Sequence, residues 1–212
     1  SKAVAGVGVG GMYIWLSQGL SSLARMGGQV NVAQAFGRGR QDEAGAFAKA
    51  ALQIVVVFGL LFALVSVIFT KELVALFHLG DAQAVRYAES YMRITCGLVI
   101  FSYLTVVLTG IYTAQGDSKT PLLANVIGLV LNMVLDPVLI LGLGPFPRME
   151  VDGAAIATVS AQFIVMMVMI LGAGNSRGEY HVLKGIRILK LTEKKFYRGV
   201  FRIGTPTAIQ GT

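Results

Sequence analysis

The chain of 212 residues has little charge, a single cysteine and only two histidines. Asp, Glu, Lys and Arg make up 14% of it, whereas an ordinary soluble domain carries about 25%. The lone Cys96 excludes a disulfide framework, and the scarcity of charge excludes an ordinary soluble domain. The chain begins SKAVAG without a visible signal peptide and stops soon after a helix begins, so we expect both ends to be cuts through a larger protein.

Hydrophobic residues replace the missing charge, at 55% of the chain and a mean hydropathy of +0.69. Four stretches lack any charged residue and a fifth holds a single Asp: 3–24, 50–70, 94–116, 153–176 and 120–147. Each is close to the ~20 residues that a membrane helix requires. Open sheet edges cannot lie in lipid, so strands are excluded. We predict an all-α, polytopic membrane bundle with helices at about 3–37, 46–70, 84–115, 120–144 and 153–175.

The net charge of +7 is unevenly distributed between the loops. The second and fourth loops hold three basic residues, and the first, third and fifth hold eleven: Arg38, Arg40, Lys49, Lys119, Arg177, Lys184, Arg187, Lys190, Lys194, Lys195 and Arg198. By the positive-inside rule, the odd loops are cytoplasmic. The basic excess therefore indicates membrane topology and contact with anionic lipid headgroups, not nucleic acid.

Two connecting segments follow from local composition. Gly116 is expected to end one helix, and Thr120 to cap the next, with Pro121 in its first turn. Residues 177–198 form a basic, amphipathic connector, expected along the inner membrane surface, with a disordered linker as the alternative. Residues 199–212 open a further helix.

Asp136 is the one charged residue within 120–147. An ionised Asp at the centre of a membrane helix costs about 2.5–3.5 kcal/mol, so such a residue is expected to be sheltered and used. Asn132 lies four residues earlier on the same helix face. Pro137 has no N–H, so it leaves the Met133 carbonyl without its helical partner and bends the helix. Carboxylate, carboxamide and freed carbonyl together suit a small cation or a mobile proton. The alternative is a carboxyl that only joins helices by hydrogen bonds.

Two further polar residues reach the depth of Asp136. With a rise of about 1.5 Å per residue, Asp136 lies ~24 Å above the cytoplasmic end of its helix, in the outer half of a core ~30 Å thick. Tyr91 and Thr158 lie ~10 Å and ~8 Å below the outer ends of theirs. With Asn132, these groups predict a polar chamber. Alternatively, the Thr158 hydroxyl bonds to its own helix, Tyr91 belongs to an interfacial belt, and Arg93 pairs with Asp136.

The segments VAQAFGRGR, QGDSKTP, LNMVLDPVLILGLG and GAAIATV occur in that order. In this the whole chain resembles the amino-terminal half of a MATE (multidrug and toxic compound extrusion) transporter. The resemblance implies twelve helices in two lobes, of which this chain matches helices two to six and, with FRIGTPTAIQG, the start of helix seven. The first helix and almost all of the second lobe are absent.

The resemblance also implies an activity, namely cation-coupled antiport of amphipathic or cationic organic compounds out of the cell across the plasma membrane. It places the cation role on Asp136, with Asn132 and Thr158 beside it, and gives Tyr91 a polar cavity position. The coupling ion is H⁺ or Na⁺, with Asp136 as the metal ligand if it is Na⁺. No further cofactor is implied.

Three alternatives remain open. A lipid-linked oligosaccharide or polysaccharide flippase has a related two-lobed plan but needs a more cationic chamber, and the spans offer only Arg25 and Arg93. An intramembrane enzyme needs a second catalytic group, and the chain has no second carboxylate within a span and no HExxH. The third is a non-functional fragment, because one lobe cannot alternate access alone. The sequence therefore favours a transporter over an enzyme.

Overall fold

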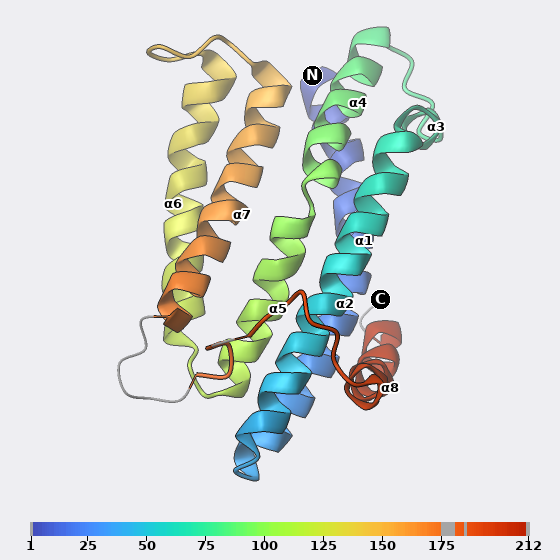
Figure 1. Ribbon diagram of the computed structural model, residues 1–212. Coiled ribbons are helices and arrows are strands. Elements are labelled where there is room, and N and C mark those ends of the chain that lie inside the picture. Colours follow the sequence, from blue (N-terminus) through green and yellow to red (C-terminus); the bar gives the residue numbers. More distant parts are fainter. Residues whose placement is uncertain (1, 175–180, 185, 211–212) are drawn as a thin grey trace.

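The computed structural model describes residues 2–174, 181–184 and 186–210, and within these ranges all regular secondary structure is helical (Figure 1). In chain order the helices are α1 (Lys2–Gly37), α2 (Gln41–Ile68), α3 (Thr70–Ala75), α4 (Ala82–Gly97), α5 (Ile100–Ala114), α6 (Lys119–Leu141), α7 (Glu150–Gly174) and α8 (Lys194–Gln210). The predicted all-α class is confirmed.

Four helices, α1, α2, α6 and α7, are long and apolar enough to cross a membrane. Helices α4 and α5 pass the same test only as a pair, so the described residues provide four spans, or five if that pair counts as one. Large apolar side chains are exposed along α2 and α6, among them Leu60, Leu61, Leu64, Leu122 and Met133. Because these side chains require an apolar solvent, the chain is a multi-pass membrane protein.

The chain breaks between α4 and α5, where the sequence predicted one continuous helix over 84–115. The two helices are bent by 44°. At the break, the Val99 N–H donates to the Cys96 carbonyl (3.4 Å) and the Phe101 N–H to the Leu98 carbonyl (3.4 Å), so the helical pattern becomes irregular. Gly97, a poor helix former, ends α4 without any proline. Local sequence gave only this weak signal.

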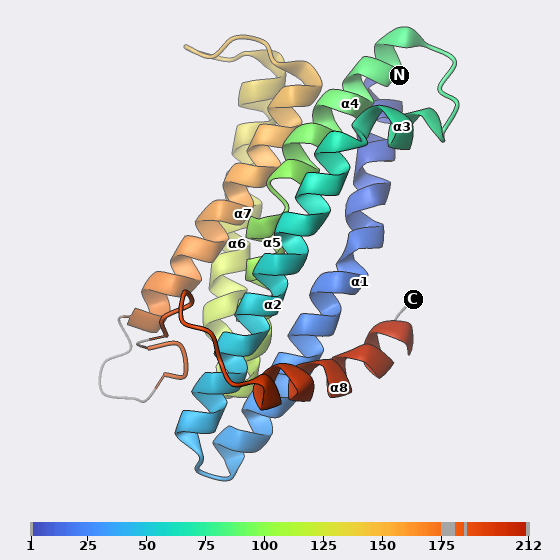
Figure 2. The same cartoon turned by 45° about the vertical axis from the view of Figure 1, so that its right-hand side comes forward.

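Helix α1 packs against α2, α4, α5 and α8 (Figures 1 and 2). Helices α6 and α7 form an antiparallel pair, and α7 joins this pair to α4 and α5. On α2, the buried face consists of Ala44, Ala48, Ala51 and Val55, spaced at four, three and four residues. Such small residues allow helix backbones to approach closely in a membrane.

Other helix ends differ from the sequence prediction by a few residues. The predicted helix 46–70 begins earlier, at Gln41, and ends at Ile68, and the separate α3 follows from Thr70. Helix α6 ends at Leu141 instead of 144, because Gly142 adopts φ 69°, the left-handed conformation that closes a helix. Helix α7 begins at Glu150 instead of 153, which brings acidic residues into its first turn. Their negative charge interacts favourably with the positive end of the helix dipole. Helix α6 continues through Pro137.

One end of the bundle carries the α1–α2 turn, the α5–α6 turn and the segment before α8; we call it the basic end. The predicted connector, 177–198, is only partly helical, since α8 begins at Lys194 instead of 199. Residues 177–180 and 185 lie outside the described residues. The rest of the connector is tied to α2, where Gln53 Nε2 donates to the carbonyl oxygens of Ile188 (2.6 Å) and Lys190 (2.8 Å).

Helix α8 crosses α1 at very close range (Figure 2). A Cβ added at Gly27 would lie 2.1 Å from the carbonyl oxygen of Val200, and one added at Gly204 would lie 2.2 Å from that of Leu23. The Asn31 side chain then donates to the Gly199 carbonyl (3.1 Å). Only glycine fits at such a crossing, so the glycines of α1 and α8 fix where α8 sits.

Candidate functional site

Asp136 lies on α6, near the end of the bundle opposite the basic end. Its Oδ1 atom is buried and has no hydrogen-bond partner among the described residues. Arg93, the candidate counter-ion, is exposed, and no ion pair joins it to Asp136 within the described structure. A buried carboxylate oxygen without a partner is costly unless an ion, a proton or water satisfies it.

Tyr91 on α4 is buried, with 8% of its surface exposed. Its ring contacts α1, where a Cβ added at Gly10 would lie 2.5 Å from the ring carbon Cδ1. On the other side it packs with Val151 and Ala155 of α7. The Asp136 carboxylate lies within electrostatic range of its phenol. Tyr91 is therefore an interior residue within electrostatic range of Asp136 and not part of an interfacial belt.

Asn132 and Thr158 line one pocket of about 260 Å³ between α6 and α7. The Thr158 hydroxyl donates to the carbonyl oxygen of Ala154 (3.0 Å), the within-helix bond considered as an alternative above. The lone pairs of the hydroxyl oxygen remain available to accept a hydrogen bond or to coordinate a cation. Asn125 and Gln162 line the same pocket further toward the basic end. Neither residue was predicted from the sequence, although Asn125 lies seven residues before Asn132, which is about two helical turns, and so shares its helix face.

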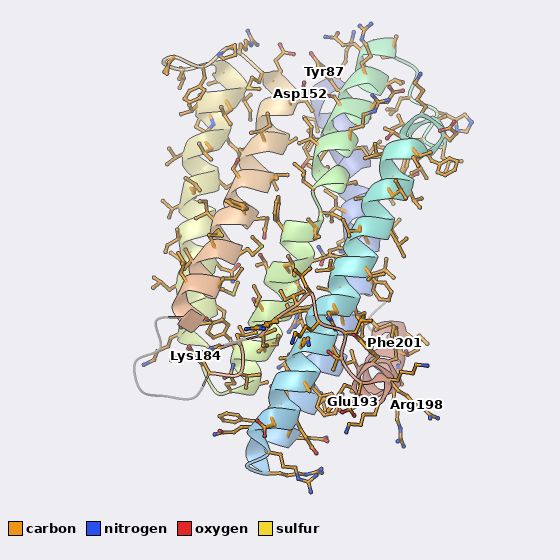
Figure 3. All side chains as sticks on the ribbon, in the orientation of Figure 1. Tyr87, Asp152, Lys184, Glu193, Arg198 and Phe201 are labelled. Carbon is orange, nitrogen blue, oxygen red and sulfur yellow. The ribbon has the colours of Figure 1, made fainter. Side chains whose placement is uncertain are left out.

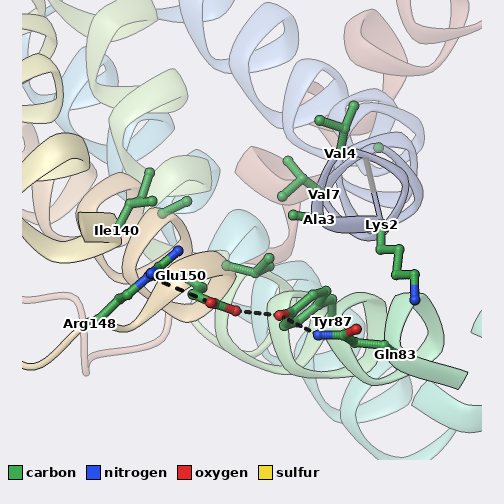
Figure 4. Close-up of a pocket in the computed structure, with 12 residues that line it drawn as sticks. Lys2, Ala3, Val4, Val7, Gln83, Tyr87, Ile140, Arg148 and Glu150 are labelled. Carbon is green, nitrogen blue, oxygen red and sulfur yellow. Dashed lines mark hydrogen bonds and ion pairs between the residues drawn. The ribbon is translucent and has the colours of Figure 1, made fainter. Parts of the chain in front are cut away.

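The opposite end of the bundle holds a wider pocket of about 800 Å³ between α1, α4, α6 and α7 (Figure 4). The Tyr87 hydroxyl donates to the Glu150 carboxylate, and Gln83 Nε2 donates to the Tyr87 oxygen (2.9 Å). One turn further in, the Ser90 hydroxyl donates to the Asp152 carboxylate. Figure 3 shows Tyr87 and Asp152 together at this end.

These two carboxylates were not predicted as site residues, because the helix was expected to begin at residue 153, after both of them. With α7 beginning at Glu150, both lie on a helix facing α4. The only available signal was the acidic pair directly before GAAIAT, which is typical of a helix first turn.

The polar groups follow one another inward from this pocket. A Cβ added at Gly153 would lie 2.7 Å from the carbonyl oxygen of Leu139. Gly153 of α7 and Leu139 of α6 therefore lie at the same depth in the bundle. Asp136 is therefore about one turn inward from Glu150 and Asp152, and the pocket of Asn132 and Thr158 is about one turn further. The structure places Tyr91 within electrostatic range of Asp136, and Asn132 and Thr158 in one pocket, without a direct hydrogen bond between the two pairs in the described residues.

These groups offer one carboxylate and several neutral oxygens. Within the described residues, no cluster of three or more His, Cys, Asp or Glu suits a multivalent metal ion. A single negative charge with amide, hydroxyl and phenol oxygens instead matches a hard monovalent cation or a proton.

The geometry defines a class, a polytopic helix bundle with a polar site between its spans. Within this class, a sequence model of the MatE family matches residues 1–138, so the chain belongs to the MatE family, as the motifs indicated. Members of this family are transporters and not enzymes.

Relatives and solved structures agree with this assignment. The chain is 28% identical over 213 residues to the "Probable multidrug resistance protein NorM" of Thermotoga maritima, covering 99% of this chain and 44% of that protein. An inward-facing structure of a multidrug resistance MATE transporter matches with a TM-score of 0.85 at 22% identity, over 98% of this chain and 46% of the other. An outward-facing structure matches with 0.84 at 22%, over 99% and 45%. The chain spans less than half the length of these proteins and has the fold of their amino-terminal lobe.

Proposed function

We propose that the intact protein exports amphipathic or cationic organic compounds by antiport with H⁺ or Na⁺, and that Asp136 is the cation-binding carboxylate. Asn132 and Thr158 supply neutral oxygens one turn further in, and Tyr91 supplies a phenol at the level of Asp136. The missing lobe completes the substrate cavity. We assign the basic end to the cytoplasmic side of the plasma membrane, following the positive-inside rule.

One observation carries this proposal, the buried and unpartnered Oδ1 of Asp136 within a membrane span. A carboxylate kept in a membrane without a counter-ion has a large cost unless it binds something. The wide pocket at the opposite end lies about one turn away, so a cation from that side has a short path to Asp136.

Binding of the cation would change which groups Asp136 can contact. A protonated Asp136 donates a hydrogen bond, whereas an ionised one accepts hydrogen bonds or coordinates Na⁺. Its neighbours Tyr91 and Asn132, and the Met133 carbonyl left free by Pro137, respond differently to these states. The cation can thus favour one arrangement of α6, α7 and α4 over another, which is the requirement for coupling. The lobe then moves against its missing partner.

The flippase alternative fits less well, because among the described residues no unpaired cation lines the pocket at the opposite end to hold a pyrophosphate. Its two basic residues are already paired, Lys2 with Asp81 (2.8 Å) and Arg148 with Glu150 (3.6 Å). The surroundings of Asp136 therefore suit a cation better than an anion.

Reconstituting the intact protein in vesicles tests the proposal, with ethidium efflux measured under an imposed H⁺ or Na⁺ gradient. Asp136→Asn keeps the side-chain volume but removes the charge, and we expect gradient-driven efflux to fall by at least about tenfold. The matched control is Glu72→Gln, an exposed carboxylate on α3, and it should behave as wild type. The gradient that drives wild-type efflux identifies the ion. Undiminished gradient-driven efflux by Asp136→Asn would contradict the assignment.

A further inference from the structure

An apolar groove of about 500 Å³ lies at the basic end between α2, the connector and α8. Val57 and Phe58 of α2 form one wall, and Leu189 and Leu191 of the connector form the other. Phe201 of α8, labelled in Figure 3, also lines it. Its ring lies edge-on to that of Phe58, with the ring centroids 6.1 Å apart.

The polar groups of this groove are used within the protein. Gln53 Nε2 holds two connector carbonyls, and Gln53 Oε1 accepts from Thr192 Oγ1 (3.1 Å) and from the Tyr197 hydroxyl. This network fixes the connector beside α2 and leaves an apolar surface facing outward.

Two connector leucines point away from the protein. Leu189 is 100% exposed and Leu191 is 89% exposed, and Val57 on the facing wall is 52% exposed. Fully exposed leucines on a segment held in place by hydrogen bonds indicate an apolar surrounding medium, since burial of a leucine is worth about 1.5–3 kcal/mol.

The groove lies at the boundary of the membrane. Gln53 is near the start of the uncharged run 50–70 of α2, so the groove begins where charged residues end. Val57 and Phe58, one turn further along, belong to the hydrocarbon region.

Cations alternate with the groove-lining residues along the chain. Arg187 precedes Ile188, Lys190 separates the two leucines, Arg198 follows Tyr197, and Arg202 follows Phe201, and all four cations are exposed. The only acidic residue in 181–210, Glu193, is paired with Lys195 (2.8 Å). The chain segment that lines the groove is therefore strongly basic.

We propose that this groove binds one anionic phospholipid from the leaflet at the basic end. An acyl chain lies against Val57 and Phe58, and the phosphate lies among the cations, chiefly Lys190 and Arg198. An apolar slot lined by a strongly basic segment at the hydrocarbon boundary matches the two parts of such a lipid in chemistry. The inference concerns lipid binding and does not depend on the transported compound or the coupling ion.

The test uses the delipidated intact protein in detergent, titrated with phosphatidylglycerol or phosphatidylcholine and read by native mass spectrometry. We expect phosphatidylglycerol to bind at least about tenfold more tightly than phosphatidylcholine. Lys190→Gln with Arg198→Gln should remove most of this preference. The matched control, Arg38→Gln with Lys119→Gln, removes two exposed cations from other loops of the same end and should leave binding within about twofold.

A second pair of variants covers the apolar half of the site. Val57→Trp keeps every charge but fills the groove, and should weaken phosphatidylglycerol binding. Leu189→Cys should react with a membrane-dissolved maleimide, because the side chain at this position is fully exposed. The native Cys96 is buried and should give little background reaction.

Four results would each overturn the proposal. They are equal binding of the two lipids, an equal loss in the control pair, unchanged binding by Val57→Trp, and a protected Leu189→Cys. The last would mean that the rest of the protein covers the groove.

Discussion

The Ser90 hydroxyl on α4 donates a hydrogen bond to the Asp152 carboxylate on α7, joining two helices through residues that are 62 apart in sequence. One turn toward the end of the bundle, Tyr87 makes the equivalent bond to Glu150. These two bonds hold the first turn of α7 against α4 just beyond Asp136. They are the polar contacts that a movement of α7 away from α4 must break.

The Ser90–Asp152 bond should show as a coupling in a double-mutant cycle. Ser90→Ala and Asp152→Asn each weaken or remove the same bond. The double variant should therefore lose less stability than the two single variants lose when their losses are added. We expect a coupling of about 1 kcal/mol, below the 1.5–3 kcal/mol of a fully buried charged hydrogen bond, because the pair is only half-buried. The measurement is the free energy of unfolding in detergent. As a control, Ser90→Ala with the distant, exposed Asp42→Asn should be additive. Additivity in the first cycle would show that the bond contributes nothing.

Gly128 should be irreplaceable while Val165 is present. A Cβ added at Gly128 would lie 2.3 Å from Cγ2 of Val165, where α6 meets α7. Gly128→Ala should therefore destabilise the protein by about 1–3 kcal/mol. Adding Val165→Ala frees the space, so the double variant should be more stable than the sum of the single changes predicts. Gly11→Ala is the control, since a Cβ there meets nothing within 4 Å. A thermal melt in detergent measures all four proteins, and the absence of rescue would contradict this account of the contact.

Asp117 should make the α5–α6 turn sensitive to acid. Its carboxylate accepts from the Thr120 hydroxyl (2.6 Å) and from the N–H groups of Thr120 and Lys119 (3.0 Å each), so Asp117 and not Thr120 caps α6. Burial alone would raise the pKa of Asp117, but these hydrogen bonds outweigh it and lower the pKa below its usual range. Because the folded pKa lies below the unfolded one, the carboxylate stabilises the protein above the unfolded pKa of about 3.9, and this is lost as pH falls through the folded pKa.

Asp117→Ala measures this contribution. At pH 7 it should cost about 1 kcal/mol, as for other helix caps. The difference from wild type should shrink as the pH falls below about 4. Melting temperatures of the intact protein at pH 7, 5 and 3.5 give the comparison, with Asp42→Ala as an exposed carboxylate control. A difference that stays constant across these pH values would assign the effect to something other than the charge.

The fold was predictable where membrane physics acts on local sequence. Runs without charge located the spans, because a charged group in lipid is costly wherever it lies. The break at Leu98 was not predictable in the same way. Gly97 packs closely against α2, where an added Cβ would lie 3.3 Å from Val67. Local sequence does not reveal this contact, and other glycines of the chain lie within continuous helices.

The candidate site was predictable in part. Asp136 stood out because it is alone in its run, and Asn132 because it shares a helix face with it. Tyr91 was ambiguous, since only the packing of α1 and α7 shows that it is interior. Gln53 gave no signal, because its partners Ile188 and Lys190 follow it by 135 and 137 residues. Contacts over such separations depend on how helices pack, which local patterns do not encode.

The break between α4 and α5 divides this span into two halves that are hydrogen-bonded to different helices. Helix α5 is anchored by Tyr103, whose hydroxyl donates to the Ser17 carbonyl (2.8 Å), and by Tyr112, whose hydroxyl donates to the Met169 carbonyl (2.5 Å). Helix α4 is attached at its far end to α7. Because the regular hydrogen-bond pattern is interrupted between them, a change of tilt in α4 need not be transmitted into α5. Tyr91 can thus be displaced relative to Asp136 while the half of the span near the basic end keeps its orientation.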